Sequence, residues 1–258
     1  MFFFERLTPT RYRASEHVGG VWNTSEQHIA PALGLLAHAI EADHLDRRRH
    51  DSLKIARLSY DILGTLPIGV VDIDITVTRP GRTIELVEAR LSHAGRTAVV
   101  ARAWLLQTPD TSAIAGTAIP SIPPPEAVEE WHPQAFWPGA FVRSIEIRRS
   151  LLDEGRAISW IRTDAALIAG ELVSPAARAL GIIDIANGLA PRIAIDEAAF
   201  PNVDLTVHLF CQPKGSWLGF DTMVSFGPNG IGLTHSTIHD EEGPVGTVSQ
   251  CLTIRRRV

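Results

Sequence analysis

The sequence predicts an α+β fold in which one arrangement, a helix followed by an antiparallel meander, occurs twice. In each half of the chain, a helix-like segment precedes four strand-like segments. The turn residues also recur at one offset, because Pro80 and Gly95 have counterparts 148 positions later in Pro228 and Gly243 (228 − 80 and 243 − 95). These two observations indicate that the second half repeats the layout of the first.

The first repeat begins with a predicted helix. Residues 23–26 (NTSE) supply capping groups, and Pro31 suits a first helical turn. We expect this helix to end at about Asp43, because an apolar stripe runs through Leu33, Leu36, Ala37 and Ile40. Four predicted strands follow at 54–63, 70–79, 82–93 and 97–107, separated by turns that contain proline or glycine.

A proline-rich connector separates the two repeats. Prolines at 109, 120, 123, 124 and 125 predict an extended segment with little capacity to pair as a strand. The second repeat adds a hairpin, at 141–149 and 156–163, before a helix with Ser174 as N-cap and Gly188 as C-terminal cap. Its four strands are predicted at 203–211, 217–226, 231–239 and 245–255. We therefore expect a first repeat at 1–108, a linker at 109–135 and a second repeat at 136–258.

The two repeats are expected to share one sheet. Each predicted sheet has an open edge and one apolar face that needs a cover, so each repeat would be marginal alone. Pairing the two sheets edge to edge would give one continuous sheet with both helices packed against it.

The composition limits the classes of function. The chain has 258 residues, of which 45% are hydrophobic and 21% charged, and its net charge of −5 gives no reason to expect nucleic-acid binding. Cys211 and Cys251 have no metal or redox spacing, so we expect buried free thiols in a reducing cytosol, no metal and no cofactor. No apolar run approaches the roughly 20 residues that span a bilayer, so we expect no membrane insertion. The interpretation is a cytoplasmic protein.

The second repeat carries polar groups where the first does not. At the same offset of 148 positions, Asp204 corresponds to Ala56, Ser225 to Val77, and Gln250 to Arg102. Gln250 shares a strand face with apolar neighbours, so its amide needs a partner. One copy is therefore interpreted as scaffold and the other as a site.

Several ordered segments resemble the acyl-CoA thioesterase II-type, thioesterase-like superfamily. They are residues 27–32 (QHIAPA), 201–209 (PNVDLTVHL), 215–219 (GSWLG) and 243–246 (GPVG) with Gln250, and the resemblance covers nearly the whole chain. It implies a double hotdog fold and hydrolysis of acyl-CoA by a water held between an Asp, a Thr or Ser, and a Gln. These roles fall on Asp204, Ser225 and Gln250. The chain departs from the pattern in having Ser for Thr, and Leu205 where a His would follow the Asp.

The residues are compatible with that chemistry. Asp204 could act as general base, while Ser225 and Gln250 orient the water. Backbone amides at the start of the helix near Pro31 could stabilise the oxyanion, with Gln27 and His28 beside them. Asp184 and Asn187 could face a substrate pocket, although capping of a helix end also explains them. We expect the acyl tail to lie in an apolar channel between the helices and the CoA head at the surface.

Other interpretations stay open. An enoyl-thioester hydratase or dehydratase would need a cooperating Asp and His, and Asp204 and His208 lie roughly 13 Å apart along one strand. A non-catalytic acyl-CoA-binding module is the other alternative. The basic residues of 47–49, Lys214 and 255–257 could meet CoA phosphates, although solvated charge also explains them. No G-x-S-x-G motif is present, which disfavours an α/β-hydrolase. A homodimer is possible.

Overall fold

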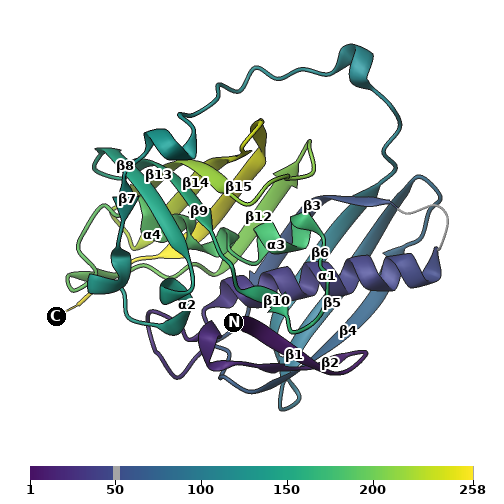
Figure 1. The fold of residues 1–258 in the computed structure, drawn as a ribbon. Coiled ribbons are helices and arrows are strands. Elements are labelled where there is room, and N and C mark those ends of the chain that lie inside the picture. Colours follow the sequence, from purple (N-terminus) through teal and green to yellow (C-terminus); the bar gives the residue numbers. More distant parts are fainter. Residues whose placement is uncertain (49–52, 258) are drawn as a thin grey trace.

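The computed structural model describes residues 1–48 and 53–257. Within them, 14 strands form one sheet in the order β10-β1-β2-β4-β5-β6-β3-β12-β15-β14-β13-β9-β8-β7. Neighbouring strands are antiparallel except for β1 and β10, which pair in parallel. The helices lie on one face of this sheet, which we call the inner face, and α1 crosses the strands of the first half (Figure 1).

The first half contains the predicted helix and all four predicted strands. Its elements are β1 (Phe2–Thr8), β2 (Arg11–Ala14), η1 (Glu16–Val18), α1 (Ile29–Arg47), β3 (Lys54–Ile62), β4 (Val70–Arg79), β5 (Ile84–His93) and β6 (Arg96–Leu106). The helix begins after the predicted capping residues, because His28 is the N-cap, and it continues for one turn beyond Asp43. The β1–β2 hairpin was not predicted.

The second half is more irregular. Its elements are η2 (Ser112–Ile114), η3 (Pro125–Ala127), β7 (Glu130–Trp131), η4 (Pro133–Ala135), α2 (Ala140–Arg143), β8 (Glu146–Asp153), β9 (Arg156–Arg162), β10 (Ala166–Ile168), α3 (Pro175–Leu180), η5 (Ile183–Ile185), α4 (Ala186–Leu189), β11 (Ala198–Ala199), β12 (Asp204–Leu209), β13 (Leu218–Phe226), β14 (Ile231–Asp240), β15 (Gly243–Thr253) and β16 (Arg255–Arg256). Two predictions were wrong here. The predicted strand at 141 begins instead with the short helix α2, and the predicted helix at 174–188 is divided by a 3-10 turn.

The two halves join edge to edge, as the sequence predicts. Strands β3 and β12 pair antiparallel from Asp61 opposite Asp204 to Arg57 opposite His208. This junction makes the sheet continuous, and the extended linker between β6 and β7 arcs from one half to the other (Figure 1).

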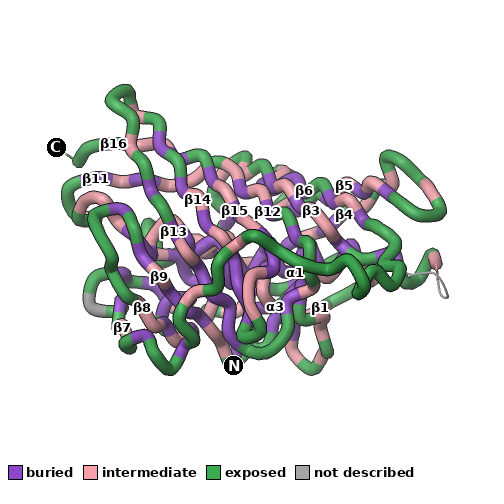
Figure 2. Tube along the Cα trace, turned by 90° about the horizontal axis from the view of Figure 1, so that it is seen from above, coloured by how far each residue is buried: buried purple, intermediate pink, exposed green. Residues whose placement is uncertain are grey.

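Helix α1 is buried on most of its surface because the sheet covers one side and α3 the other. The two helices meet where both have glycine: a Cβ added to Gly34 would lie 2.6 Å from the Cα of Gly181. Buried residues gather along the helices and the middle of the sheet, whereas peripheral loops are exposed (Figure 2). Cys211 and Cys251 are both exposed, so the prediction of buried thiols was wrong.

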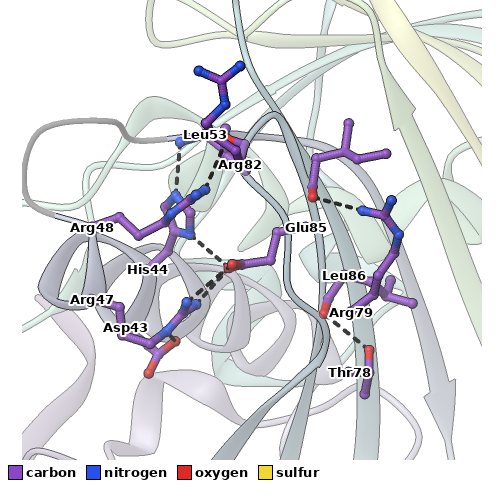
Figure 3. Close-up of polar contacts among 11 residues, drawn as sticks. Asp43, His44, Arg47, Arg48, Leu53, Thr78, Arg79, Arg82, Glu85 and Leu86 are labelled. Atoms are coloured by element: carbon purple, nitrogen blue, oxygen red, sulfur yellow. Dashed lines mark hydrogen bonds and ion pairs between the residues drawn. The ribbon is translucent and has the colours of Figure 1, made fainter.

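A buried polar cluster fixes the C-terminal end of α1 to β5 (Figure 3). His44 Nε2 accepts the N–H of Leu53, so its other nitrogen Nδ1 carries the proton and donates to Glu85 at 2.9 Å. Arg47 donates to the same carboxylate at 2.8 Å. Burial opposes ionisation of Glu85, but the hydrogen bonds from Arg47 and His44 outweigh it and lower its pKa.

Arg47, Arg48 and Lys214, which were predicted as CoA contacts, have polar partners within the chain. Arg47 is engaged by Glu85 and by Asp43, and Arg48 donates to the carbonyl of Arg82. Arg49 and His50 lie outside the described residues. Lys214 is paired with Glu242 at 2.6 Å.

Among the described helices, none is both long and apolar enough to cross a membrane.

Candidate active site

The structure does not bring Asp204, Ser225 and Gln250 together. On β12, Leu205 and Val207 point to the inner face, so Asp204 lies on the outer face, where it accepts the N–H of Cys251 at 2.6 Å. Ser225 is exposed on the outer face of β13, whereas Gln250 on β15 is 1% exposed on the inner face. The predicted arrangement of these three groups around one water was therefore wrong.

Gln250 instead meets Asp184 beneath the helices. Its Nε2 donates to Asp184 Oδ1 at 2.9 Å, and Asn202 Nδ2 donates to the same oxygen at 2.7 Å. Asp184 is only 5% exposed. A buried carboxylate with two amides on one oxygen forms the centre of the candidate site, which we call the Asp184 cluster (Asp184, Asn202 and Gln250).

The local backbone explains how these residues meet. Asp184 lies in the 3-10 turn η5, between Ile183 and Ile185, at the break after α3. Asn202 lies two residues before the start of β12 and forms an isolated bridge with Leu252, two residues after Gln250. Its second amide hydrogen goes to the backbone carbonyl of Asp204 at 3.0 Å. Asp204 therefore serves the cluster through its backbone, by helping to hold the amide of Asn202.

The environment of Asp184 disfavours its charged form. Burial raises its pKa to about 7, although the hydrogen bonds from Asn202 and Gln250 act in the opposite direction. Both amides donate to Oδ1, and Oδ2 accepts no hydrogen bond from the described residues. Oδ2 is therefore available to accept a proton from a molecule in the adjoining cavity, near neutral pH.

That cavity has a volume of about 810 Å³ and is lined by residues from both halves of the chain. The four residues predicted to bind substrate all line it: Gln27, His28, Asp184 and Asn187. Asn202 lines it as well, and the remaining wall is largely apolar and aromatic, with Trp22, Trp137, Ile62, Leu66 and Ile185. A mainly apolar cavity with a few polar groups in its wall is typical of a small-molecule site.

The start of α1 contributes a further polar group to this cavity. His28 Nδ1 accepts the N–H of Ala30 at 3.2 Å, its ring stacks on Phe141, and burial lowers its pKa to about 3, so it is neutral. Pro31 has no N–H. The N–H of Ile29, which lines the cavity, makes no hydrogen bond among the described residues. It is therefore free to donate to a developing negative charge at a helix N-terminus.

Comparison with known proteins agrees with this geometry. A family model described as the acyl-CoA thioesterase N-terminal domain matches residues 19–106, and one described as the acyl-CoA thioesterase C-terminal domain matches residues 119–254. The chain belongs to the acyl-CoA thioesterase family. No match is found among the curated proteins.

Solved structures show that this thioesterase family member has the double hotdog fold. It is similar to a proposed thioesterase from Novosphingobium aromaticivorans, with 17% identity, a TM-score of 0.74, and coverage of 97% of this chain and 98% of that one. A protein of unknown function with a hot dog fold from Alicyclobacillus acidocaldarius matches with 13% identity, a TM-score of 0.72, and coverage of 99% and 96%. An acyl-CoA thioesterase II from Mycobacterium marinum matches with 16% identity, a TM-score of 0.66, and coverage of 98% and 95%.

The sequence interpretation missed Asn202 and placed Asp184 only in substrate binding. Signals for both were present. Asp184 is a lone carboxylate in the apolar run 182–185, and Asn202 lies within the segment 201–209 that carries the resemblance. The partner that Gln250 needed could have been sought among carboxylates on the helix side of the sheet.

Asp204 and His208, the pair considered for a hydratase or dehydratase, do not line the cavity. Asp204 is on the outer face, and His208 lines a separate groove there, together with Trp104 and Phe210. Within residues 1–48 and 53–257, no group of three His, Cys, Asp or Glu side chains is arranged to hold a metal ion.

Of the basic residues predicted as CoA contacts, Arg255, Arg256 and Arg257 line the main cavity.

Proposed function

We propose that the protein hydrolyses acyl-CoA to a free acid and CoA by direct attack of a water that Asp184 activates. The observation that carries this proposal is the Asp184 cluster, in which two amides hold Oδ1 and leave Oδ2 toward the cavity. The family membership supports thioester hydrolysis in general. The roles of the individual residues are our assignment.

The reaction needs one base, one water and a donor for the oxyanion. The water oxygen bonds to the thioester carbonyl carbon while Asp184 Oδ2 accepts a water proton. The N–H of Ile29 is our candidate donor to the resulting oxyanion. Collapse of the tetrahedral intermediate breaks the carbon–sulfur bond, and the proton passes from Asp184 to the departing CoA sulfur. Asn202 lines the cavity and its Oδ1 carries no hydrogen bond from the described residues, so it could accept from the water, whereas Gln250 is buried behind Asp184 and orients the carboxylate.

Direct attack by water is preferred over a seryl or cysteinyl intermediate, because none of the described serine and cysteine residues lines the cavity. A single turnover in ¹⁸O-labelled water tests this step. Attack by water places the label in the acid formed in the first turnover. An unlabelled first product would instead indicate attack by the Asp184 carboxylate itself.

The main test follows free thiol release from a panel of acyl-CoA chain lengths. Asp184→Asn should lower kcat by about 10²- to 10⁴-fold, the usual contribution of a general base. The matched control is Asp204→Asn, because Asp204 lies on the outer face and Asn can still accept the N–H of Cys251. Equal turnover by Asp184→Asn and wild type would refute the proposal.

The alternatives give different results in the same assay. A non-catalytic acyl-CoA-binding module would bind the thioester without releasing thiol. A hydratase would consume an enoyl-CoA without releasing thiol, and its product would be a hydroxyacyl-CoA.

We place the proposed hydrolysis in cytoplasmic lipid metabolism as part of the same proposal. A homodimer remains a prediction.

A further inference from the structure

Three consecutive arginines, Arg255, Arg256 and Arg257, form the basic rim of the main cavity. All three residues are exposed, whereas Asp184, which lines the same cavity, is buried. The cavity wall therefore combines a buried carboxylate with arginines that reach the surface.

The backbone of this basic rim is held in place. Strand β16 pairs with β11, with Arg255 opposite Ala199 and Arg256 opposite Ala198. The N–H of Arg257 donates to the carbonyl of Glu197 at 2.8 Å, which extends the ladder by one residue. These arginines thus project from a fixed ladder that continues directly from β15, the strand that carries Gln250.

The guanidinium groups have no acidic partners among the described residues. Other arginines among the described residues do form ion pairs, for example Arg6 with Glu171 and Arg162 with Glu146. No such pair involves residues 255–257. The guanidinium of Arg257 instead lies over the ring of Trp22, 5.9 Å from its centroid, and Trp22 itself packs edge-on against Trp137 and Phe200.

The cavity wall also carries more positive than negative side chains. Its charged residues are the three arginines of the basic rim, Glu26, and Asp184, whose pKa of about 7 leaves it partly neutral. A positive rim on a chain of net charge −5 is therefore a local feature. Clustered guanidinium groups bind phosphate through paired N–H donors and steer anions toward a cleft.

We propose that the basic rim binds the phosphate groups of CoA. This binding makes the enzyme selective for CoA thioesters over thioesters that lack phosphate. This inference rests on the proposed hydrolysis and deepens it. The phosphates bind at the exposed rim, while the thioester reaches the buried Asp184 cluster through the apolar cavity. Arg255 and Arg257 lie two residues apart in the extended ladder, so they act from one side of it.

The experiment compares one acyl group on two carriers, CoA and N-acetylcysteamine, the second of which lacks every phosphate. The double variant Arg255→Gln/Arg257→Gln should raise KM for the acyl-CoA by about 10-fold to 100-fold with kcat nearly unchanged, as expected for lost charged hydrogen bonds. Its kcat/KM for the N-acetylcysteamine thioester should equal that of wild type. Rising ionic strength should raise KM for acyl-CoA in wild type more than in the variant.

The matched control is Arg82→Gln. Arg82 is exposed, its side chain forms no ion pair among the described residues, and it lies near the C-terminal end of α1 (Figure 3). It is not among the residues that line the cavity. This variant should keep the wild-type KM for acyl-CoA.

The outcomes separate the two proposals. If wild type hydrolyses neither thioester, the proposed function fails. If wild type hydrolyses both and the double variant keeps the wild-type KM for acyl-CoA, only the role of the basic rim is overturned. An equal loss on both carriers overturns it too, because it would show that the arginines act through the fold and not on phosphate.

Discussion

The side-chain amide of Gln250 lies 2.9 Å from the carboxylate of Asp184, and the two residues come from β15 and from the turn that interrupts the second helix. This contact joins the inner face of the sheet to the helical layer beside the cavity, which Asp184 lines. Because Asn202 donates to the same oxygen, the carboxylate is oriented from two sides. The chemistry and the stability of this site both depend on the charge of that carboxylate.

The pH dependence of catalysis should report the ionisation of Asp184. Since its pKa is about 7 and the ionised form acts as base, kcat/KM should rise with pH and level off above neutrality. Gln250→Leu removes a hydrogen bond that lowers this pKa, so the acidic limb of the profile should move up by about one pH unit. Steady-state kinetics from pH 5 to 9 would measure this, with Asp204→Asn as the control whose limb stays in place. If the acidic limb of Gln250→Leu stayed at its wild-type pH, the ionisation in the profile would belong to a group other than Asp184.

The same carboxylate should destabilise the folded protein at high pH. Its pKa is raised from about 4 in the unfolded chain to about 7 in the fold, so the neutral form adds stability that is present below the unfolded value and lost as pH rises through 7. Asp184→Asn keeps the shape and removes the charge. We expect this variant to be more stable than wild type at pH 8 by on the order of 2–4 kcal/mol, and equally stable near pH 4. Urea denaturation at both pH values would show the difference, and a gain of the same size at both would point to a cause other than the charge.

The long strands could be predicted because each has enough residues for its alternation of apolar and polar side chains to be visible. Strand β4 was predicted with its observed bounds, and β3, β5 and β6 differ by one or two residues at an end. The β1–β2 hairpin was missed because residues 2–4 are all phenylalanine and show no alternation. Strand β10 has three residues, too few for a period to be visible.

The site was harder to predict because alternation fixes faces but not distances. Alternation on β12 already placed Asp204 opposite the buried side chains, which is the face that the helices do not cover. Gln250 was correctly expected to need a partner, but that partner is 66 positions away in a helical segment. No periodicity within one strand indicates which helical residue lies above it. Such a contact arises only when the second helix breaks and packs on the sheet.

The crossing of α1 and α3 should depend on the absence of a side chain at Gly34. A Cβ there would lie 2.6 Å from the Cα of Gly181 and 2.7 Å from the carbonyl oxygen of Ala177, and both are backbone atoms that cannot turn aside. Gly34→Ala should therefore separate the helices and destabilise the protein by about 1–3 kcal/mol, although alanine favours helices elsewhere. The control is Gly116→Ala, where an added Cβ would meet nothing within 4 Å. Thermal unfolding of both variants measures the effect, and an unchanged midpoint for Gly34→Ala would show that the crossing tolerates a wider spacing.

The polar cluster at the other end of α1 should make stability depend on pH in the acid range. The pKa of Glu85 is lowered in the fold by the hydrogen bonds from Arg47 and His44, which outweigh its burial, so its contribution is present above the unfolded pKa and lost as pH falls through the folded one. Glu85→Gln removes the charge and leaves the His44 proton an acceptor. We expect a loss of about 1–3 kcal/mol at pH 7 that shrinks below about pH 4, where wild type loses the same interaction. Denaturation of both proteins from pH 3 to 7 tests this, with Glu154→Gln, at an exposed ion pair with Arg192, as the control. A difference between wild type and Glu85→Gln that stays constant across this range would show that the cluster is held by packing and not by the charge of Glu85.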